Sequence, residues 1–337
     1  MDFLPDTDQI ALVDSTRDFI HSRFPLNLPS GDREAGAVVD DIRWKEIAEL
    51  GWLGLATAEE HGGFGATLLD EAFVFREIGR ALVPGPVLST LAAARLASWT
   101  TKTDLTQRLV SGQVRVSRAV LVPGSGNTGD MVLLNDPQGS ALTLLVTPTT
   151  ALLSAAPTDV ELSPGIEDDV MVGRTTASAL GETLIRTDDT AVVSALSRVL
   201  SILTSAQLAG NAAATRDLAT EHAKARVQFG KPIGAFQAIK HRCADMAINA
   251  HAAENVMFLA ALTESQAPSG RDFDALAAAV FCRRAAFDNA QANIQIHGAM
   301  GFTVESPAHR FLKRAHSLSG TEGFGSASFR LAAQPRQ

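Results

Sequence analysis

The stretch Arg-Val-Gln-Phe-Gly-Lys-Pro-Ile-Gly-Ala-Phe-Gln at residues 226–237 decides the fold, because it interrupts a helical pattern at one defined place. Ala-rich segments with apolar residues at helical spacing lead into it and away from it. Gly230, Pro232 and Gly234 do not fit inside one continuous helix. We therefore predict that one helix ends at Arg226 and that the next has Gln237 in its first turn.

The two ends of this break carry chemistry that suits a phosphorylated ligand. Arg226 offers a planar cation with paired donors, and Gln237 offers an amide that both donates and accepts hydrogen bonds. Together they suit a diphosphate joined to a heteroaromatic base. For the arginine alone, a helical hairpin with a surface arginine is the preferred alternative. The complete string is much more specific than the arginine.

The composition excludes several classes of protein. The chain has 337 residues, which suggests about two to three domains. Apolar residues make up 46% and supply a core, while the charged fraction of 20% is below the usual ~25%, as in proteins that hide surface in an oligomer. The net charge of −8 and the lack of a basic stripe argue against nucleic acid as a partner.

Cysteine usage and apolar tracts indicate a cytoplasmic protein. Cys243 and Cys282 lack metal-ligand spacing and lie in apolar helical segments, so we expect buried, reduced thiols in a reducing compartment. The acidic start of the chain has no cationic region typical of a signal peptide. The longest apolar tract, residues 191–214, is interrupted by Arg198 and by amides. It predicts a buried amphipathic helix and no membrane span.

The pattern of the sequence changes twice along the chain. Helical spacing dominates residues 6–100, with helices expected at 40–50, 69–82 and 88–99, and Gly51 is expected to end the first of these. Short apolar runs separated by Gly, Pro, Asn and Asp then predict strands at 114–122, 131–135, 141–148 and 170–174. Helical spacing returns at 195–226, 235–264, 273–297 and near 308–318, which predicts a four-helix bundle.

These patterns predict a mainly α protein with a small β module. The expected domains are an N-terminal helical domain at 1–111, a β domain at 112–189 and a C-terminal helical bundle at 190–337. Such an order of helical domain, small β domain and helical bundle is rare.

Three further motifs accompany the stretch at 226–237. The first runs through Leu-Gly-Trp-Leu-Gly-Leu at 50–55, Glu-Glu-His-Gly-Gly-Phe-Gly at 59–65 and Glu-Ile-Gly-Arg at 77–80. Its glycines permit a tight crossing of helix and loop, and no catalytic group is required in it. The second is Gln-Ile-His-Gly-Ala-Met-Gly-Phe at 295–302, and the third is Thr-Glu-Gly at 321–323.

Together these motifs resemble those of the acyl-CoA dehydrogenase family along essentially the whole chain. The stretch at 226–237 resembles the family signature R-x-x-F-G-x-x-I-x-x-F-Q. The stretch at 295–302 resembles Q-x-x-G-G-x-G-[FY], with Ala299 in place of the second glycine. The resemblance implies an N-terminal helical domain, a middle β-barrel domain, a C-terminal four-helix bundle and an FAD cofactor.

The resemblance also implies roles for individual residues toward FAD. Arg226, Phe229 and Gln237 match the residues that hold the pyrophosphate and adenine end of an FAD whose flavin is seated in a neighbouring subunit. The matching residues of the second cofactor loop are Gln295, Gly298 and Ala299. His297 has no partner at metal-ligand spacing, so it is expected to be packed or hydrogen-bonded, and we predict no metal site.

Glu322 falls where many members carry Y-E-G-T, whose glutamate is the catalytic base. Such a base needs a partly desolvated carboxylate that removes the α-proton of a thioester. From spacing alone, a glutamate in a Gly/Ser-rich tail is more commonly a solvated side chain. Other members place the base on the third bundle helix. The matching position here is Arg284, which cannot act as a base because it does not lose its proton.

Two segments depart from the family pattern. Members carry T-E-P-x-A-G-S-D around the flavin ring, whereas residues 121–130 here read Leu-Val-Pro-Gly-Ser-Gly-Asn-Thr-Gly-Asp. After Glu322, the usual Thr and Gln are replaced by Phe324 and Ser326. We therefore predict that the chain keeps its half of the FAD-tail site and has lost most of its own flavin-ring site.

This combination resembles the small subunit of heteromeric actinobacterial acyl-CoA dehydrogenases, in which a larger partner holds the flavin ring. The resemblance implies an α2β2 heterotetramer and an acyl-CoA substrate that gains an α,β double bond. By analogy with the subgroup, that substrate is the CoA thioester of a steroid side chain, and an electron-transfer-flavoprotein-type acceptor is expected. Two alternatives stay open: a self-sufficient homo-oligomeric dehydrogenase with Glu322 as base, and a flavin-free scaffold or regulatory subunit.

Overall fold

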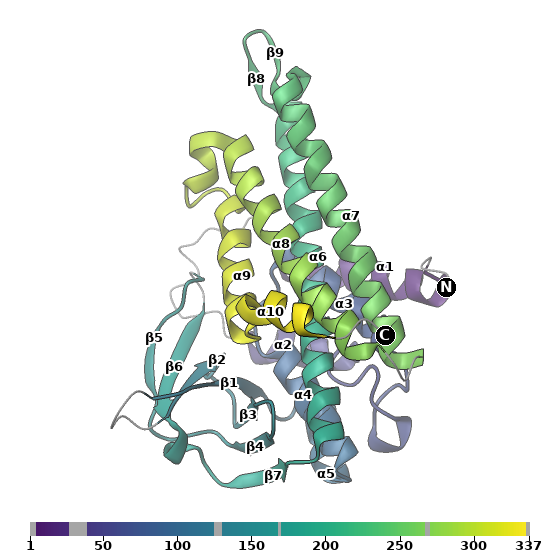
Figure 1. The fold of residues 1–337 in the computed structure, drawn as a ribbon, viewed down its shortest axis with the longest axis vertical. Coiled ribbons are helices and arrows are strands. Elements are labelled where there is room, and N and C mark those ends of the chain that lie inside the picture. The colour runs from purple at the N-terminus through teal and green to yellow at the C-terminus, as the bar shows by residue number, and fades with distance from the viewer. Residues whose placement is uncertain (1–4, 27–38, 125–129, 168–169, 267–269, 335–337) are drawn as a thin grey trace. The chain divides into compact units, whose positions relative to one another are not determined.

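The structure is a computed structural model that describes residues 5–26, 39–124, 130–167, 170–266 and 270–334. The helices are α1 (Thr7–Arg23), α2 (Asp41–Glu49), α3 (Leu68–Ala81), α4 (Val87–Trp99), α5 (Thr103–Val110), α6 (Thr190–Ala225), α7 (Gln237–Gln266), α8 (Arg271–His297), α9 (Ala308–Thr321) and α10 (Ala327–Ala333). The strands are β1 (Val116–Val122), β2 (Met131–Asn135), β3 (Leu142–Val146), β4 (Ala151–Ala155), β5 (Glu161–Pro164), β6 (Met171–Thr176), β7 (Thr183–Thr187), β8 (Val227–Gln228) and β9 (Lys231–Pro232). This confirms the predicted mainly α fold class with a small β module (Figure 1).

The chain divides by packing into two compact units, which we describe separately. The bundle unit comprises Met1–Asp32, Leu68–Val83 and Ser201–Gln337. The sheet unit comprises Arg33–Thr67 and Pro84–Leu200. The division into three domains at 111/112 and 189/190 stays a prediction.

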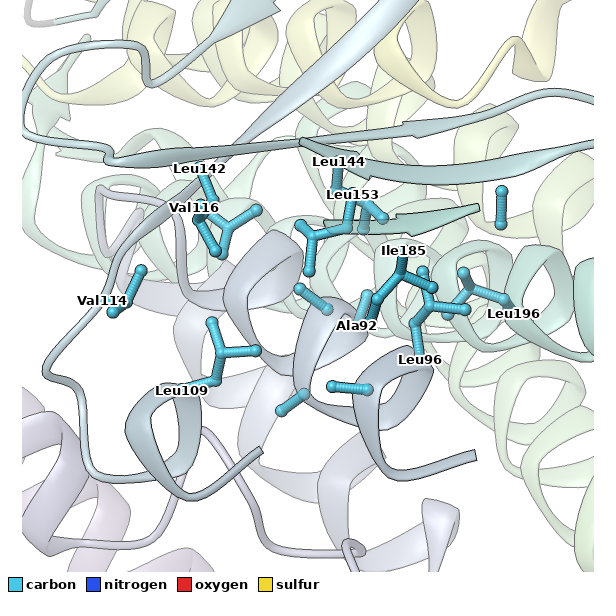
Figure 2. Packing of buried hydrophobic residues seen from close by; sticks show 14 of the residues in the cluster. Ala92, Leu96, Leu109, Val114, Val116, Leu142, Leu144, Leu153, Ile185 and Leu196 are labelled. Atoms are coloured by element: carbon cyan, nitrogen blue, oxygen red, sulfur yellow. The ribbon is translucent and has the colours of Figure 1, made fainter. Parts of the chain in front are cut away.

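The sheet unit contains a seven-stranded sheet in the order β5-β6-β2-β1-β3-β4-β7. Neighbouring strands are antiparallel, apart from β1 and β3, which are parallel. Side chains of α4 and α5 meet those of the strands in one apolar core, where Leu96 and Leu109 lie with Leu144 and Leu153 (Figure 2). At about 25 cal/mol per Å² of apolar surface removed from water, such a core is the main stabilising term of the unit.

Four predicted strands are confirmed as β1, β2, β3 and β6, but the sequence did not predict β4, β5 and β7. All four residues of β5 are exposed, so this strand carries no apolar alternation that a sequence pattern could detect. It is a strand because its backbone pairs with β6, with Leu162 opposite Gly173. Pairing with a neighbouring strand, and not a local sequence pattern, therefore determines that residues 161–164 form a strand, as is common for β-structure.

The bundle unit contains the predicted four-helix bundle, formed by α6, α7, α8 and α9 (Figure 1). Helix α6 ends at Ala225 and α7 begins at Gln237, so the predicted break is confirmed at both ends. The hairpin of β8 and β9 fills the break and stands at the top end of the bundle in Figure 1.

The bundle helices have the burial expected of a globular core, with one correction. Of the described helices, only α6 is long and apolar enough by composition to cross a membrane, yet 61% of its most apolar window is buried inside the structure. We read it as the buried core helix that its sequence predicted.

The two cysteines differ in burial. Cys282 is buried, and burial raises the pKa of its thiol. The prediction that Cys243 is buried is wrong: it is half-buried, because α7 residues on either side of it, such as Arg242 and Ala244, face solvent.

Glycines let α3 and α6 approach closely within the bundle unit. A Cβ added at Gly79 would stand 2.0 Å from the Gln207 carbonyl oxygen, and one at Gly210 would stand 1.9 Å from the Arg76 carbonyl oxygen. Real Cβ atoms cannot come so near to backbone, so only glycine permits this crossing. The first motif was predicted to permit a tight crossing of helix and loop, but the close approach at Gly79 is between two helices.

A buried carboxylate joins three arginines in the bundle unit. The Glu77 side chain on α3 is 3% exposed. It accepts hydrogen bonds from Arg17 Nε at 3.0 Å and from Arg76 Nη2 at 2.8 Å, and Arg80 Nε lies 3.5 Å from it. Arg80 also donates to Asp217 on α6 at 2.8 Å. This network, which we call the Glu77 cluster, connects α1, α3 and α6 through charged groups.

Candidate cofactor site

The break between α6 and α7 folds into a tight hairpin with a strained aromatic at its tip. The two turn residues, Phe229 and Gly230, have φ of +53° and +78°. Positive φ at both central residues is the type I′ geometry of two-residue hairpins, but it is costly for a phenylalanine. The Phe229 side chain is nevertheless 92% exposed. A strained aromatic held in solvent makes this tip a candidate binding element.

Arg226 and Gln237 lie at the base of the hairpin. The Arg226 amide donates to the His222 carbonyl oxygen at 2.9 Å, and the Ile233 amide donates to the Arg226 carbonyl oxygen at 2.8 Å. Both the Arg226 guanidinium and the Gln237 amide are exposed. Among the described residues, neither side chain has a hydrogen-bond or ion-pair partner. Their donors are therefore available to a ligand.

The end of α8 carries the second predicted loop. Gln295 is exposed in the last turn, and Gly298 ends the helix with φ of +64°, a conformation that disfavours any other residue. Ala299 follows, exposed, in a short 3-10 turn over Gly298–Phe302. A Cβ at Gly298 would meet no atom within 4 Å. The backbone at Gly298 thus borders open space that a ligand can enter.

Tertiary packing brings the two motifs together. Ile233 beside the hairpin and Ile296 beside the loop belong to one apolar cluster, which we call the floor of the site. Next to two residues of this cluster along the chain, Ala223 and Ile296, the rings of His222 and His297 stack with centroids 4.1 Å apart. Since His222 lies one turn before Arg226 and His297 precedes Gly298, the contact joins the arginine to the glycine loop. We refer to these groups together as the tail site.

His297 behaves as predicted, and His222 was missed. His297 Nδ1 lies 2.9 Å from the Asn293 carbonyl oxygen, so this histidine is both packed and hydrogen-bonded. No group of three potential metal ligands occurs among the residues that the structure describes. His222 was not singled out because its neighbour His297 is distant in sequence. The only signal available was its position four residues before Arg226.

Glu322 does not join the tail site. It follows the last residue of α9 and is half-buried. In Figure 1 this end of α9, next to α10, lies well away from the β8–β9 hairpin. Arg284, the other position considered for a base, is exposed on α8 and its Nε lies 3.5 Å from Asp288 Oδ2. Part of the segment that departs from the ring-site pattern, residues 125–129, lies outside the described residues.

Comparison with known proteins identifies the family. The profile of the acyl-CoA dehydrogenase N-terminal domain matches residues 6–112, and that of the C-terminal domain matches residues 197–329. The acyl-CoA dehydrogenase IpdE2 of Mycolicibacterium smegmatis is 31% identical over 82% of this chain and 82% of its own length. This chain belongs to the acyl-CoA dehydrogenase family.

Another relative is the acyl-CoA dehydrogenase FadE34 of Mycobacterium tuberculosis, which is 33% identical over 82% of this chain. The match covers only 39% of FadE34. Among solved structures, the ChsE4–ChsE5 complex of Mycobacterium tuberculosis has a TM-score of 0.84 at 22% identity, covering 100% of both chains. The Tcur3481–Tcur3483 steroid acyl-CoA dehydrogenase variant has a TM-score of 0.82 at 22% identity, covering 96% of each. These likenesses establish the acyl-CoA dehydrogenase fold.

Acyl-CoA dehydrogenases use FAD, and the tail site has the right groups for one end of it. The guanidinium of Arg226 is unpaired among the described residues, as a diphosphate-binding cation would be before its ligand arrives. Open space borders Gly298, and the amides of Gln237 and Gln295 face solvent. This donor set fits a diphosphate and an adenine.

Proposed function

We propose that this chain is a subunit of a FAD-dependent acyl-CoA dehydrogenase that introduces an α,β double bond into an acyl-CoA thioester. In this proposal, a larger partner subunit seats the flavin ring, and this chain holds the diphosphate and adenine end of the same FAD. Two copies of each chain form an α2β2 heterotetramer in the cytoplasm, and an electron-transfer-flavoprotein-type acceptor takes the electrons onward.

The observation that carries this proposal is the outward-facing tail site. Arg226 and Phe229 are exposed at the end of the bundle, and the Phe229 side chain is 92% exposed. At the same time, residues 121–130 contain neither the glutamate nor the serine–aspartate pair that the family uses around the flavin ring. A chain with one half of a cofactor site needs a second chain to complete it.

Each residue of the tail site has a defined task toward FAD, which as a cofactor accepts the hydride leaving the β-carbon. Arg226 would donate two parallel hydrogen bonds to the diphosphate. The amide of Gln237 would donate to and accept from the adenine edge, with Gln295 alongside. Gly298 would let the backbone approach the cofactor.

A steroid side-chain CoA thioester is the proposed substrate. Its support is the structural likeness to the Tcur3481–Tcur3483 steroid acyl-CoA dehydrogenase variant. Turnover of a panel of CoA thioesters by the assembled complex tests this. Faster turnover of straight-chain fatty acyl-CoA than of steroid side-chain CoA would contradict the substrate assignment while leaving the family unchanged.

The chain purified alone should contain far less than one FAD per protomer, because an isolated tail site leaves the flavin ring in water. Co-expression with an adjacent larger acyl-CoA dehydrogenase chain should give a yellow complex. The measurement is the flavin absorption spectrum against protein concentration. Stoichiometric flavin in the chain expressed by itself would overturn the shared-site proposal. Colourless protein in both preparations would instead support a flavin-free scaffold.

A second candidate is a self-sufficient dehydrogenase with Glu322 as base, favoured by the glutamate retained at the end of α9. We propose instead that Glu322 is a remnant, because the ring of a shared FAD would lie in the partner. Glu322→Gln keeps the shape of the side chain and removes its basicity, so kcat should stay within about threefold. General-base catalysis typically contributes 10²–10⁴-fold. A fall in kcat of about a hundredfold with flavin content intact would show that Glu322 is the base.

A further inference from the structure

The rings of His222 and His297 stack on each other in the tail site. Their ring centroids are 4.1 Å apart, with planes inclined by 28°. His297 Nδ1 must carry a proton, because the Asn293 carbonyl oxygen at 2.9 Å can only accept. In the neutral ring, Nε2 of His297 is therefore left as an acceptor. Among the described residues, neither nitrogen of His222 has a hydrogen-bond partner.

The pair lies between the groups proposed to bind the diphosphate. The hydrogen bond from the Arg226 amide to the His222 carbonyl oxygen keeps these residues four apart in helical geometry, so their side chains share one face. On the other side, His297 is followed directly by Gly298, whose backbone borders open space. Both residues are half-buried, so part of the pair is accessible to solvent.

The charges around the pair are cationic. Burial lowers the pKa of His222 most, and the charges of His297 and Arg226 lower it further. From α7, the titratable group in the floor is the half-buried Cys243 thiol. Among the described residues, no carboxylate acts on His222 to oppose this shift. Without an anion present, these effects keep His222 mostly neutral near pH 7.

We infer that the His222–His297 pair takes up one proton when the diphosphate binds, and that it then acts beside Arg226 as a second cation of the tail site. This inference rests on the proposed FAD-tail function. A bound anion favours the imidazolium, because opposite charges attract. A second proton is disfavoured because two imidazolium rings 4.1 Å apart would repel each other.

The expected consequence is proton-linked cofactor binding. Protonation of the free pair prepares it for the anion, so FAD should bind more tightly as pH falls toward the lowered pKa of His222. Above that pKa, each pH unit can change the affinity by at most about tenfold for one linked proton. We expect the dissociation constant of FAD to fall about five- to tenfold between pH 8 and pH 6.

The test measures FAD binding to the assembled, deflavinated complex by flavin fluorescence from pH 8 to pH 6. His222→Phe keeps an aromatic ring in the stack and removes the ring with the lowered pKa, so it should flatten the pH dependence. His297→Phe removes the neighbouring charge that lowers the pKa of His222, so it should move the pH dependence to higher pH. His251→Phe, at an exposed position on α7, is the matched control and should keep the wild-type slope. Equal slopes in wild type and in both stack variants would overturn the inference.

A second measurement keeps the test valid if a stack variant folds poorly. Calorimetric titration of the deflavinated wild-type complex with ADP-ribose, in two buffers of different ionisation enthalpy, counts the protons taken up with a probe that has the diphosphate but no flavin. Uptake of a fraction of one proton at pH 7 supports protonation of the His222–His297 pair on diphosphate binding, and zero uptake contradicts it. The Arg226→Ala variant distinguishes the proposed FAD-tail function from the proposed protonation of the histidine pair. If Arg226→Ala leaves FAD affinity unchanged, the tail-site proposal is wrong. If it lowers FAD affinity at every pH while the stack variants keep the wild-type slope, only the inference about the histidine pair is wrong.

Discussion

Replacing Arg226 by alanine is expected to weaken FAD binding by about one to two decades in the assembled complex. The reason is the loss of a charge-assisted bidentate contact with the diphosphate, which costs roughly 1.5–3 kcal/mol. Folding should be nearly unaffected, because the guanidinium is exposed and has no ion-pair partner among the described residues. The measurement is flavin content after gel filtration, followed by the dissociation constant from titration of the apo-complex.

A matched control for Arg226 is Arg174→Ala. Arg174 is also exposed, but it lies on β6 and pairs with Glu161. It belongs to none of the motifs proposed to contact FAD. Its removal should leave flavin content and affinity unchanged. Arg226→Lys tests the geometry of the contact, because a lysine keeps the charge and loses the planar fork. If Arg226→Ala retains wild-type affinity, Arg226 does not bind the diphosphate.

Glu77→Gln is expected to lower the free energy of unfolding by about 3–5 kcal/mol, because it removes one partner from a buried ionic network. The carboxylate is 3% exposed, and two of the arginines around it donate hydrogen bonds to its oxygens. Glutamine keeps the volume but cannot neutralise Arg17, Arg76 and Arg80. Chemical denaturation of wild type and variant under identical conditions measures the difference.

The control for this second prediction is Glu161→Gln, which breaks a pair between Glu161 and Arg174 on the surface of the sheet unit. There the carboxylate is 67% exposed, and exposed pairs contribute only about 0–1 kcal/mol. A loss of stability no larger for Glu77→Gln than for Glu161→Gln would contradict the structural role assigned to the Glu77 cluster.

The pH dependence gives an independent check on the Glu77 cluster. Burial by itself raises the pKa of Glu77, but the hydrogen bond from Arg17 and the charges of Arg76 and Arg80 outweigh it, and the net pKa is lowered. A carboxyl whose pKa is lowered in the folded state stabilises the protein above its unfolded pKa of about 4.3. That contribution is lost as pH falls through the lower, folded pKa. Wild type and Glu77→Gln should therefore begin to converge in stability as pH falls below about 4.3, and should converge fully only below the lowered, folded pKa of Glu77.

The sequence alone determined the fold class, because its strongest patterns are local. A glycine and proline cluster at 226–237 stops a helix whatever surrounds it, and α6 and α7 end and begin where that cluster predicts. The long helices were predictable for the same reason, since apolar residues at three- and four-residue steps describe a single helix face. The strand β5 was not, because it is held by its partner β6 and not by a pattern of its own.

The sequence also determined which residue types are available for a cofactor, but tertiary structure decided which of them meet. Arg226 and Gly298 stand far apart along the chain. They share one site because Ile233 and Ile296 pack into one floor and His222 stacks on His297. The same packing leaves Glu322 at the end of α9, outside that site. Which side chains share a site depends on how helices pack, and no local spacing encodes the contact between α6 and α8 that created the histidine pair.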